Sequence, residues 1–474
     1  MIKHIVIIGG GPAGYVGAIH AATHGAKVTL VEAAEIGGTC LNQGCIPTKT
    51  LVATCALLEK IRHAASVGIQ LDGNAIPRWD AMKSSMNKTV NTLTGGVRAL
   101  LADRGVISIS GLAHMSGPQS VMVEGHGEIC GDFILLCTGS HAIRPSTFPF
   151  DDERVVTSDE LLRWETLPRS LVIVGDGVIA CEFAFIMNTL GVEVTVIGMG
   201  KSPLSTLDHE ISALIGYEMR KKKIRFVGNS AVRALNLHAG SVTAECDGDI
   251  TVEAERALVA VGRRPNTSAL GLEAIGLKTG ALGDIPVDEY MRSQFPSIYA
   301  AGDVNGRVLL AHAASAQARV AVDHMLGLAP RKINARDIPL AVFTSPEVGC
   351  VGLTENEAKN MGIDVRCGTF NLRGLGKAQA MGELSGMVKV VAEVQTGRLL
   401  GLHIVGAHAS DLVHEGAIIL RQAGTVEDLE HTIHAHPTLA EGIQEAAEDV
   451  FGHAIHKILQ KKEKIRVSPL DNCL

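Results

Sequence analysis

Two cysteines stand five residues apart in the segment Gly37–Lys49, which reads GGTCLNQGCIPTK. In regular α-helix this spacing would hold the Cα atoms of Cys40 and Cys45 roughly 8–9 Å apart, whereas a disulfide cannot span much more than ~7 Å. Either the two thiols are unbonded or the backbone between them is irregular. The glycines of the segment and Pro47, which has no amide proton to donate, favour the irregular backbone.

The residues that follow, TKTLVATCALLEKI, predict a helix, so the cysteines lie at its N-terminal end. There the helix dipole lowers the pKa of a thiol and favours the reactive thiolate. Three kinds of site are possible: a redox-active disulfide, a metal site and a pair of inert buried thiols. A metal site needs two further ligands at suitable spacing, and the neighbouring sequence offers none. We therefore predict no metal and favour the redox pair over inert thiols.

A redox disulfide needs a proton carrier, and the segment HTIHAHPTLAEG offers one. His436 is followed five residues later by Glu441. Histidine exchanges protons near neutral pH, and a carboxylate can fix its tautomer and raise its basicity. The alternatives are an ordinary core or interface histidine and a metal cluster with His431 and His434, for which no cysteine or acid cluster completes the set.

The pair also needs an electron acceptor, and residues 4–32 predict a dinucleotide-binding unit. Gly9, Gly11 and Gly14 follow a β-rich run and open a helical stretch, and a second strand ends at Glu32. These glycines permit a tight turn, close approach of a pyrophosphate and packing of helix on strand. The helix N-terminus favours the diphosphate, and Glu32 is placed to accept hydrogen bonds from an adenosine ribose. The alternative is a glycine-rich turn without a ligand.

The same pattern returns 166 residues later, in LVIVGDGVIACEFAFIMNTLGVEVTVIG. Without a gap, Gly9, Gly11, Gly14, Gly25 and Val28 align with Gly175, Gly177, Ala180, Gly191 and Val194. Two such units predict two dinucleotides, a flavin and a nicotinamide, with electrons passed between them.

The second unit differs from the first at informative positions. Gly198 stands where Glu32 stood, so the acid that usually binds the NAD ribose is missing. Lys201 follows in the same loop, but no arginine pair is present to bind a 2′-phosphate. Ala180 in place of the third glycine is often seen in NADP binders. The choice between NAD and NADP stays open, and we expect NAD to be preferred by an unusually small margin.

Composition limits the class of protein. The chain has 474 residues, too many for one hydrophobic core, and 43 basic against 50 acidic residues give a net charge of −7. This balance argues against a nucleic-acid binder. No apolar run reaches the ~18 residues of a membrane span, and no signal peptide is apparent. Ten cysteines scattered along the chain suggest a reducing, cytoplasmic setting rather than a secreted disulfide framework.

The segment GGTCLNQGCIPTK strongly resembles the redox-disulfide motif of the flavoprotein disulfide reductases, the class I pyridine nucleotide-disulfide oxidoreductase family. Within the family it is most similar to the motif of the dihydrolipoamide dehydrogenases. The resemblance covers essentially the whole chain. Further motifs in the family's order are LLCTGS with Thr138 and Gly139, VGRRPN with Gly262, IYAAGDV with Asp303, FTSPEVGCVGLTE, and HAHPTLAEG.

The resemblance implies a role for each residue of the site. Cys40 would exchange with a dithiol substrate, and Cys45 would lie against the flavin of FAD. Lys49 and Glu182 would pair near the flavin. His436 would be the base, steered by Glu441, and would serve the disulfide of the other subunit of a homodimer. The implied cofactor-binding residues are Gly9, Gly11, Gly14, Glu32, Lys49, Thr138, Gly139, Asp303, Gly175, Gly177, Ala180, Gly198 and Gly262.

Electrons would pass from dihydrolipoamide, held by a lipoyl carrier on a separate chain, to the disulfide, to FAD and to NAD⁺. Two NADPH-dependent relatives are rivals. Mercuric reductase has a paired C-terminal cysteine motif, whereas Cys473 stands alone here. Glutathione reductase is favoured by Ala180 but not by the missing arginines. A flavin-binding protein without turnover is the third alternative. Which lipoyl-dependent complex is served, and what Cys473 does, stay open.

The predicted fold is α/β, with two Rossmann-like domains for FAD and NAD(P) and a C-terminal α+β dimerisation domain. The expected segments are a first FAD segment at 1–145, an NAD(P) domain at 146–268, a central segment at 269–338 that completes the FAD domain, and an interface domain at 339–474. A helical excursion is expected near residues 50–100.

Overall fold

The computed structural model describes residues 2–458, so Cys473 lies outside the described residues. The chain divides into two compact units. The first comprises Met1–Ile338 and Phe343–Ser345, and the second comprises Pro339–Val342 and Pro346–Leu474. The paired cysteines belong to the first unit and His436 belongs to the second.

The first unit begins with a five-stranded parallel sheet in the order β18-β7-β1-β2-β3, which we call the first module together with its helices. Its strands are β1 (His4–Ile8), β2 (Lys27–Glu32), β3 (Ile107–Ser110), β7 (Phe133–Leu136) and β18 (Ile298–Ala300). The central strand β1 carries the buried run IVII, the pattern of a parallel strand that is covered on both faces. Because β18 comes from much later in the chain, a distant segment completes this sheet.

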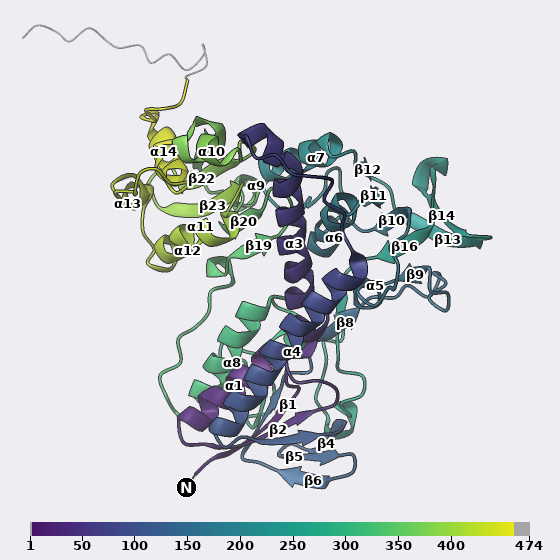
Figure 1. The fold of residues 1–474 in the computed structure, drawn as a ribbon. Coiled ribbons are helices and arrows are strands. Elements are labelled where there is room, and N and C mark those ends of the chain that lie inside the picture. Colours follow the sequence, from purple (N-terminus) through teal and green to yellow (C-terminus); the bar gives the residue numbers. More distant parts are fainter. Residues whose placement is uncertain (1, 459–474) are drawn as a thin grey trace, which may run out of the picture. The chain divides into compact units, whose positions relative to one another are not determined.

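Helices α1 (Pro12–Thr23) and α8 (Ala311–Met325) pack against each other beside this sheet (Figure 1). The buried face of α1 consists of alanine and glycine and that of α8 is rich in alanine, so the two backbones approach closely. Pro12 begins α1, where its missing amide proton costs nothing because the first-turn amides have no helical acceptor.

Two insertions interrupt the first module. Between β2 and β3 the chain forms α2 (Gly38–Asn42), α3 (Cys45–His63) and α4 (Trp79–Asp103), in agreement with the helical excursion expected near residues 50–100. Between β3 and β7 it forms a three-stranded antiparallel meander of β4 (Ala113–Gly117), β5 (Ser120–Val123) and β6 (Gly127–Cys130).

A second sheet in the first unit repeats the central strand order of the first, but its edge strand β9 precedes its other strands in the chain, whereas β18 follows those of the first sheet. We call this repeat the second module. Its parallel sheet has the order β12-β11-β10-β16-β9. The strands are β9 (Val155–Val156), β10 (Ser170–Val174), β11 (Glu193–Ile197), β12 (Arg225–Val227) and β16 (Arg256–Val259). Even the register is repeated: His4 pairs with Lys27 in the first sheet and Ser170 with Glu193 in the second. The repeat seen in the sequence is therefore a structural repeat.

The remaining elements of the first unit join or extend the two modules. The helices are α5 (Ser158–Leu161), α6 (Val178–Thr189) and α7 (His209–Lys221). A second antiparallel meander consists of β13 (Val232–His238), β14 (Ser241–Cys246) and β15 (Thr251–Ala254). A two-stranded antiparallel ribbon pairs β8 (Ser140–Ala142) with β17 (Arg263–Pro265). This ribbon brings the segments LLCTGS and VGRRPN together.

The second unit is built on a five-stranded antiparallel sheet in the order β19-β20-β23-β22-β21. The strands are β19 (Leu340–Val342), β20 (Val348–Gly352), β21 (Val365–Asn371), β22 (Met387–Glu393) and β23 (Leu399–Val405). The helices are α9 (Glu355–Asn360), α10 (Gly376–Met381), α11 (Ala409–Leu412), α12 (His414–Arg421), α13 (Val426–Glu430) and α14 (Glu441–Phe451). Helix α14 packs against β21 and β22.

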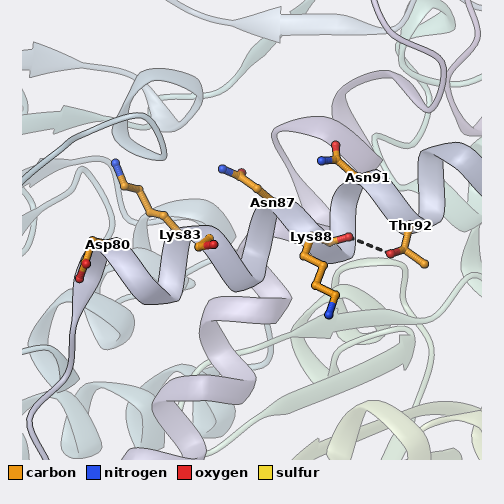
Figure 2. A pocket seen from close by; sticks show the side chains of 7 residues that line it. Asp80, Lys83, Asn87, Lys88, Asn91 and Thr92 are labelled. Carbon is orange, nitrogen blue, oxygen red and sulfur yellow. Dashed lines mark hydrogen bonds between the residues drawn. The ribbon is translucent and has the colours of Figure 1, made fainter.

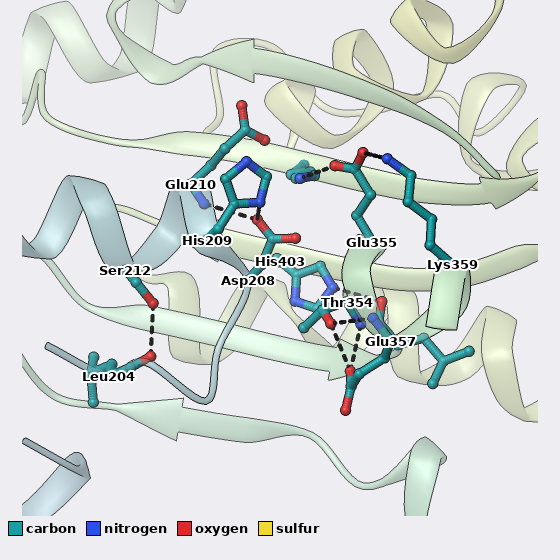
Figure 3. Close-up of polar contacts among 12 residues, drawn as sticks. Leu204, Asp208, His209, Glu210, Ser212, Thr354, Glu355, Glu357, Lys359 and His403 are labelled. Carbon is teal, nitrogen blue, oxygen red and sulfur yellow. Dashed lines mark hydrogen bonds and ion pairs between the residues drawn. The ribbon is translucent and has the colours of Figure 1, made fainter. Parts of the chain in front are cut away.

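One buried ion pair fixes α9 on this sheet. Lys389 of β22 is fully buried, and its Nζ donates to Glu355 Oε2 at 2.7 Å. Lys359 donates to the other oxygen of Glu355 (Figure 3). Hydrogen bonds from Lys359 and Lys389 lower the pKa of Glu355 to about 2, which keeps the carboxylate charged beside the buried ammonium. Thr354 and Glu357 form the capping box at the start of this helix.

These elements confirm the predicted α/β fold class, with two dinucleotide-binding topologies and a C-terminal α+β unit. Among residues 2–458, no helix combines the length and the apolar character that crossing a membrane requires.

Candidate active site

The loop between β1 and α1 has the geometry that binds a diphosphate. Gly9 has φ of +99°, and a Cβ there would lie 2.3 Å from the Cys137 carbonyl oxygen. A Cβ on Gly14 would lie 1.8 Å from the Gly9 carbonyl oxygen, so neither position accepts a side chain. Helix α1 begins after Gly11 with no side chain capping its first amides. Those amides remain available to an anionic ligand.

A carboxylate closes this loop. Glu32, at the end of β2, accepts hydrogen bonds from the Gly10 amide at 2.5 Å and from the Ala34 amide at 2.8 Å. It therefore lies beside the loop, where an acid binds the ribose hydroxyls of a dinucleotide. The glycine cradle, the open helix end and this acid fit the FAD that the sequence implies for the first module.

Three segments far apart in the sequence meet at Asp303. Ser140 Oγ donates to Asp303 Oδ2 at 2.5 Å, and Arg263 Nε donates to Ser140 Oγ at 2.8 Å. Thr138 Oγ1 donates to the Asn266 carbonyl at 2.7 Å, and the Asn266 amide side chain donates back to the Thr138 carbonyl at 2.9 Å. The structure thus places two hydrogen-bonded groups side by side on one ribbon, Thr138 with Asn266 and Asp303 with Ser140 and Arg263. Sequence reasoning did not select Ser140 or Arg263.

The paired cysteines lie where two helices meet. Helix α2 ends at Asn42, and α3 begins at Cys45, with a break between them. The irregular backbone expected from the glycines and Pro47 is therefore present. The Gly37 amide donates to the Gly10 carbonyl at 2.9 Å, so the cysteine segment is bonded directly to the phosphate loop of the first module.

The two thiols are free in the structure and differ in acidity. A hydrogen bond from Cys40 lowers the pKa of Cys45 to about 7, and the nearby charge of Lys49 acts in the same direction. The same hydrogen bond, together with burial, raises the pKa of Cys40. Above about pH 7 the reduced pair therefore favours a Cys45 thiolate that accepts a hydrogen bond from the Cys40 thiol. Burial and the charges of both cysteines raise the pKa of Tyr15, a neighbour that sequence reasoning missed.

Lys49 and Glu182 form an ion pair between α3 and α6. Lys49 Nζ donates to both oxygens of Glu182, at 2.9 and 2.8 Å. The Glu182 side chain is only 4% exposed and accepts a third hydrogen bond, at 3.0 Å, from the Phe343 amide. A carboxylate so buried is stable only with its partner, and loss of one member of such a pair costs about 3–5 kcal/mol. The pair fixes Lys49 one helical turn from Cys45.

The loop between β10 and α6 repeats the phosphate-loop geometry. Gly175 has φ of +120°, and a Cβ there would lie 2.3 Å from the Ala260 carbonyl oxygen, as in the first module. Helix α6 begins after Gly177 without a side-chain cap, and Ala180 is fully buried. Gly262, in the segment after β16, has φ of +123°. The loop and the helix end fit a second dinucleotide, as the sequence implies.

Within this loop lies an acid that the sequence motif does not mark. Asp176 Oδ2 accepts a hydrogen bond from the Gly200 amide at 2.7 Å. Gly198, at the position of the missing acid, directly follows β11. Lys201 is exposed. The signal for Asp176 was present in the sequence, because GDG in the second module replaces GGG in the first.

In the second unit, His436 and Glu441 lie together. His436 Nδ1 is 2.8 Å from Glu441 Oε1, and the Thr438 amide donates to Glu441 Oε2 at 2.8 Å. The His436 side chain is 77% exposed in the single chain. The neighbouring His434 makes a different pair, with Glu415 at 3.1 Å, which raises the pKa of His434. His434 is thus held by its own carboxylate.

A polar hollow of about 740 Å³ lies elsewhere, along one face of α4 (Figure 2). Its lining residues are Asp80, Lys83, Ser84, Asn87, Lys88, Asn91 and Thr92. None of the predicted site residues lines it. All of the lining comes from one helix, so the hollow is a feature of an exposed helix surface rather than a built binding site.

Comparisons with known proteins match nearly the whole chain. A dihydrolipoyl dehydrogenase of Bacillus subtilis (strain 168) is 36% identical over 457 residues, which cover 95% of this chain and 99% of that protein. A dihydrolipoyl dehydrogenase of Halobacterium salinarum is 38% identical over 466 residues, covering 96% and 97%. The crystal structure of LpdA from Mycobacterium tuberculosis superposes with a TM-score of 0.87 at 30% identity, covering 94% of this chain and 99% of that one.

The family comparison covers both units. Residues 3–318 match the family described as pyridine nucleotide-disulphide oxidoreductase. Residues 338–447 match the dimerisation domain described for the same family. With the two phosphate loops, the thiol pair and the C-terminal α+β unit in place, this chain belongs to the pyridine nucleotide-disulphide oxidoreductase family.

Proposed function

We propose that this chain is a dihydrolipoamide dehydrogenase, which oxidises dihydrolipoamide on a separate lipoyl-bearing chain and reduces NAD⁺. The observation that carries the proposal is the asymmetric thiol pair beside the first phosphate loop, in which Cys45 favours the thiolate and Cys40 the thiol. The names of the curated relatives support the same activity. The complex served is a 2-oxoacid dehydrogenase or glycine cleavage complex.

The cofactors are FAD, held by the first module, and NAD(H), held by the second. When bound, FAD takes two electrons from the thiol pair and passes them to the nicotinamide. In the proposed FAD site, Gly9, Gly11 and Gly14 hold the diphosphate, Glu32 the adenosine ribose and Asp303 the ribityl chain. Gly175 and Gly177 hold the diphosphate of NAD.

The chain's own residues carry out the thiol chemistry. In the proposed reaction a dihydrolipoamide thiolate attacks the Cys40 sulfur of the oxidised pair, and Cys45 leaves as the thiolate. A thiol of lower pKa is the better leaving group, so the acidity of Cys45 sets the direction of cleavage. His436 accepts the proton of the substrate thiol, and Glu441 stabilises the resulting imidazolium.

We further propose a homodimer in which His436 and Glu441 act on the thiol pair of the partner. The dimerisation domain and the exposure of His436 support it. Ile433, three residues earlier, is 95% exposed in the single chain. We also propose the division into an FAD segment at 1–145, an NAD(P) domain at 146–268, a central segment at 269–338 and an interface domain at 339–474. A cytoplasmic location is proposed as well, and the scattered cysteines support it.

Steady-state turnover of the purified enzyme tests the function. We expect dihydrolipoamide with NAD⁺ to give a kcat/KM at least about a hundredfold above glutathione disulfide or Hg²⁺ with NADPH. Cys40→Ser and Cys45→Ser should each abolish turnover, whereas the exposed Cys130 tolerates the same change. Faster reduction of glutathione disulfide or Hg²⁺ would assign the chain to another member of the family.

A further inference from the structure

The two modules hold a carboxylate in the same place but take it from different residues. In the first module the Glu32 carboxylate joins two backbone amides, those of Gly10 and Ala34. The constant offset of 166 residues relates these positions to Gly198, Asp176 and Gly200 in the second module.

In the second module the carboxylate of Asp176 accepts from the Gly200 amide at 2.7 Å. Gly200 is the counterpart of Ala34, so the backbone amide at the same position donates to a carboxylate in both modules. The acid, however, is attached at the loop position of Gly10 rather than at the strand end. Asp176 therefore crosses the space between loop and strand from the opposite side.

Steric contacts show that the second module, with Asp176 in place, does not accept a side chain at Gly198. A Cβ on Gly198 would lie 2.4 Å from both the Cβ and an oxygen of Asp176. A Cβ on Gly200 would lie 2.6 Å from the same oxygen. In the first module a Cβ on Gly10 would lie 3.1 Å from a Glu32 oxygen. Of the loop position and the strand-end position, each module thus has an acid at one and a glycine at the other.

The loop that receives the Asp176 carboxylate is well anchored. The Leu204 amide donates to the Asp176 carbonyl at 2.8 Å. Ser212 Oγ of α7 donates to the Leu204 carbonyl at 2.7 Å, and Asp208 caps the same helix (Figure 3). The carboxylate is partly exposed, and within residues 2–458 its second oxygen has no hydrogen-bond partner. That oxygen can accept a hydrogen bond from a ligand hydroxyl.

We propose that Asp176 is the residue that binds the adenosine ribose hydroxyls of the pyridine nucleotide and selects against a 2′-phosphate, in place of the acid missing at Gly198. The inference rests on the proposed function, which assigns the pyridine nucleotide to the second module. The anionic carboxylate accepts from the hydroxyls and repels a phosphate dianion. The single exposed Lys201 offsets this repulsion only weakly. The preference for NAD over NADP is then wider than the absence of an acid at Gly198 suggests.

Binding of two nucleotide fragments tests the proposal without turnover. ADP-ribose and 2′-phospho-ADP-ribose are titrated calorimetrically into the FAD-loaded enzyme. We expect the wild type to prefer ADP-ribose by at least about a hundredfold. Asp176→Asn keeps the shape and the bond to Gly200 but removes the charge. The substitution should weaken the binding of ADP-ribose about 10- to 100-fold. It should narrow the preference for ADP-ribose over 2′-phospho-ADP-ribose at least tenfold. Glu193→Gln, at the opposite end of β11, removes the same charge and should change neither affinity.

Moving the acid from the loop position to the strand end gives an independent test. Gly198→Glu alone introduces the clash with Asp176 and should weaken both ligands. Adding Asp176→Gly recreates the arrangement of Gly10 and Glu32, and should return ADP-ribose affinity to within about threefold of the wild type. FAD content and circular dichroism establish that each variant folds.

The outcomes distinguish a failure of the proposed function from a failure of the proposed role of Asp176. A wild type that binds neither fragment refutes the pyridine-nucleotide site and with it the proposed function. A wild type that binds ADP-ribose, with Asp176→Asn unchanged within twofold for both fragments, refutes only the role of Asp176. Failure of the folded double variant to recover ADP-ribose affinity also counts against that role.

Discussion

Removal of the Cys40 thiol should make Cys45 a weaker acid. The pKa of Cys45 falls from its reference value of 9.0 to about 7, and the hydrogen bond from Cys40 is the largest cause. This shift corresponds to ~2.7 kcal/mol at ~1.36 kcal/mol per pKa unit. A hydrogen bond to a charged acceptor is worth ~1.5–3 kcal/mol. We therefore expect Cys40→Ala to raise the pKa of Cys45 by ~1–2 units.

The rate of alkylation measures this change directly. At pH 7 the thiolate fraction of Cys45 should fall from about one half to ~1–10%, so iodoacetamide should react ~5- to 50-fold more slowly. Cys40→Ser keeps a hydroxyl donor and should show less than half of the shift in midpoint. The rates are followed by mass spectrometry of the Cys45 peptide between about pH 5.5 and 10.

A buried cysteine on the same helix provides the control. Burial raises the pKa of Cys55 to about 12, so Cys55 reacts slowly and Cys55→Ala should leave the Cys45 midpoint in place. A Cys40→Ala midpoint within ~0.3 unit of the wild type, or below it, would refute the assignment of the hydrogen bond as the main cause.

The same shift predicts a pH dependence of stability for the reduced enzyme. The folded pKa of Cys45 lies below its unfolded value, so between about pH 7 and 9 the unfolded chain binds more protons than the folded one. Stability should therefore rise with pH across this window and be lost as the pH falls through about 7. Thermal unfolding of the reduced wild type, compared with reduced Cys45→Ser, should show this difference.

Three further changes test other parts of the site. Gly14→Ala should abolish FAD binding, because its Cβ would lie 1.8 Å from a carbonyl oxygen of the phosphate loop. Gly95 lies in open space on α4, so the control variant Gly95→Ala should bind FAD normally and gain about 0.5–1 kcal/mol of stability. Absorbance measures the bound FAD, and thermal unfolding measures the stability. Glu441→Gln removes the negative charge 2.8 Å from His436, so kcat should fall at least about tenfold, and an unchanged kcat would argue against coupling of the two residues. Refolded heterodimers of His436→Ala and Cys40→Ser should regain activity that neither variant has alone, and verified heterodimers without activity would contradict a shared site.

The sequence predicted the parts of this molecule that local pattern determines. The strand, glycine loop and helix of each module are set by residues within about 30 positions of one another, so motif spacing was enough to find both. The break between the two cysteines also followed from local glycines and Pro47. The roles assigned to Cys40, Cys45 and His436 came from family resemblance and remain proposals.

Contacts between segments far apart in the sequence could not be predicted from local sequence patterns. Ser140 and Asp303 are 163 positions apart, and only the folded chain brings them together. Asp176 was missed for a different reason. The glycine motif leaves its position unspecified, and the strand end at Gly198 gave the impression of a missing acid. The folded structure was needed to show that the carboxylate of the second module comes from the loop position and not from the strand end.

The mutual exclusion at positions 176 and 198 constrains how this site changes during evolution. Starting from glycine and glutamate, as in the first module, acquiring an aspartate in the loop brings two acids into one space. Starting from aspartate and glycine, an acid at the strand end meets the Asp176 side chain. On the proposed role of Asp176, each single step should pass through an intermediate that binds nucleotide less well, whereas the paired change should not. Among homologous sequences the two positions should therefore covary, with lineages divided between the two solutions and few members carrying both acids.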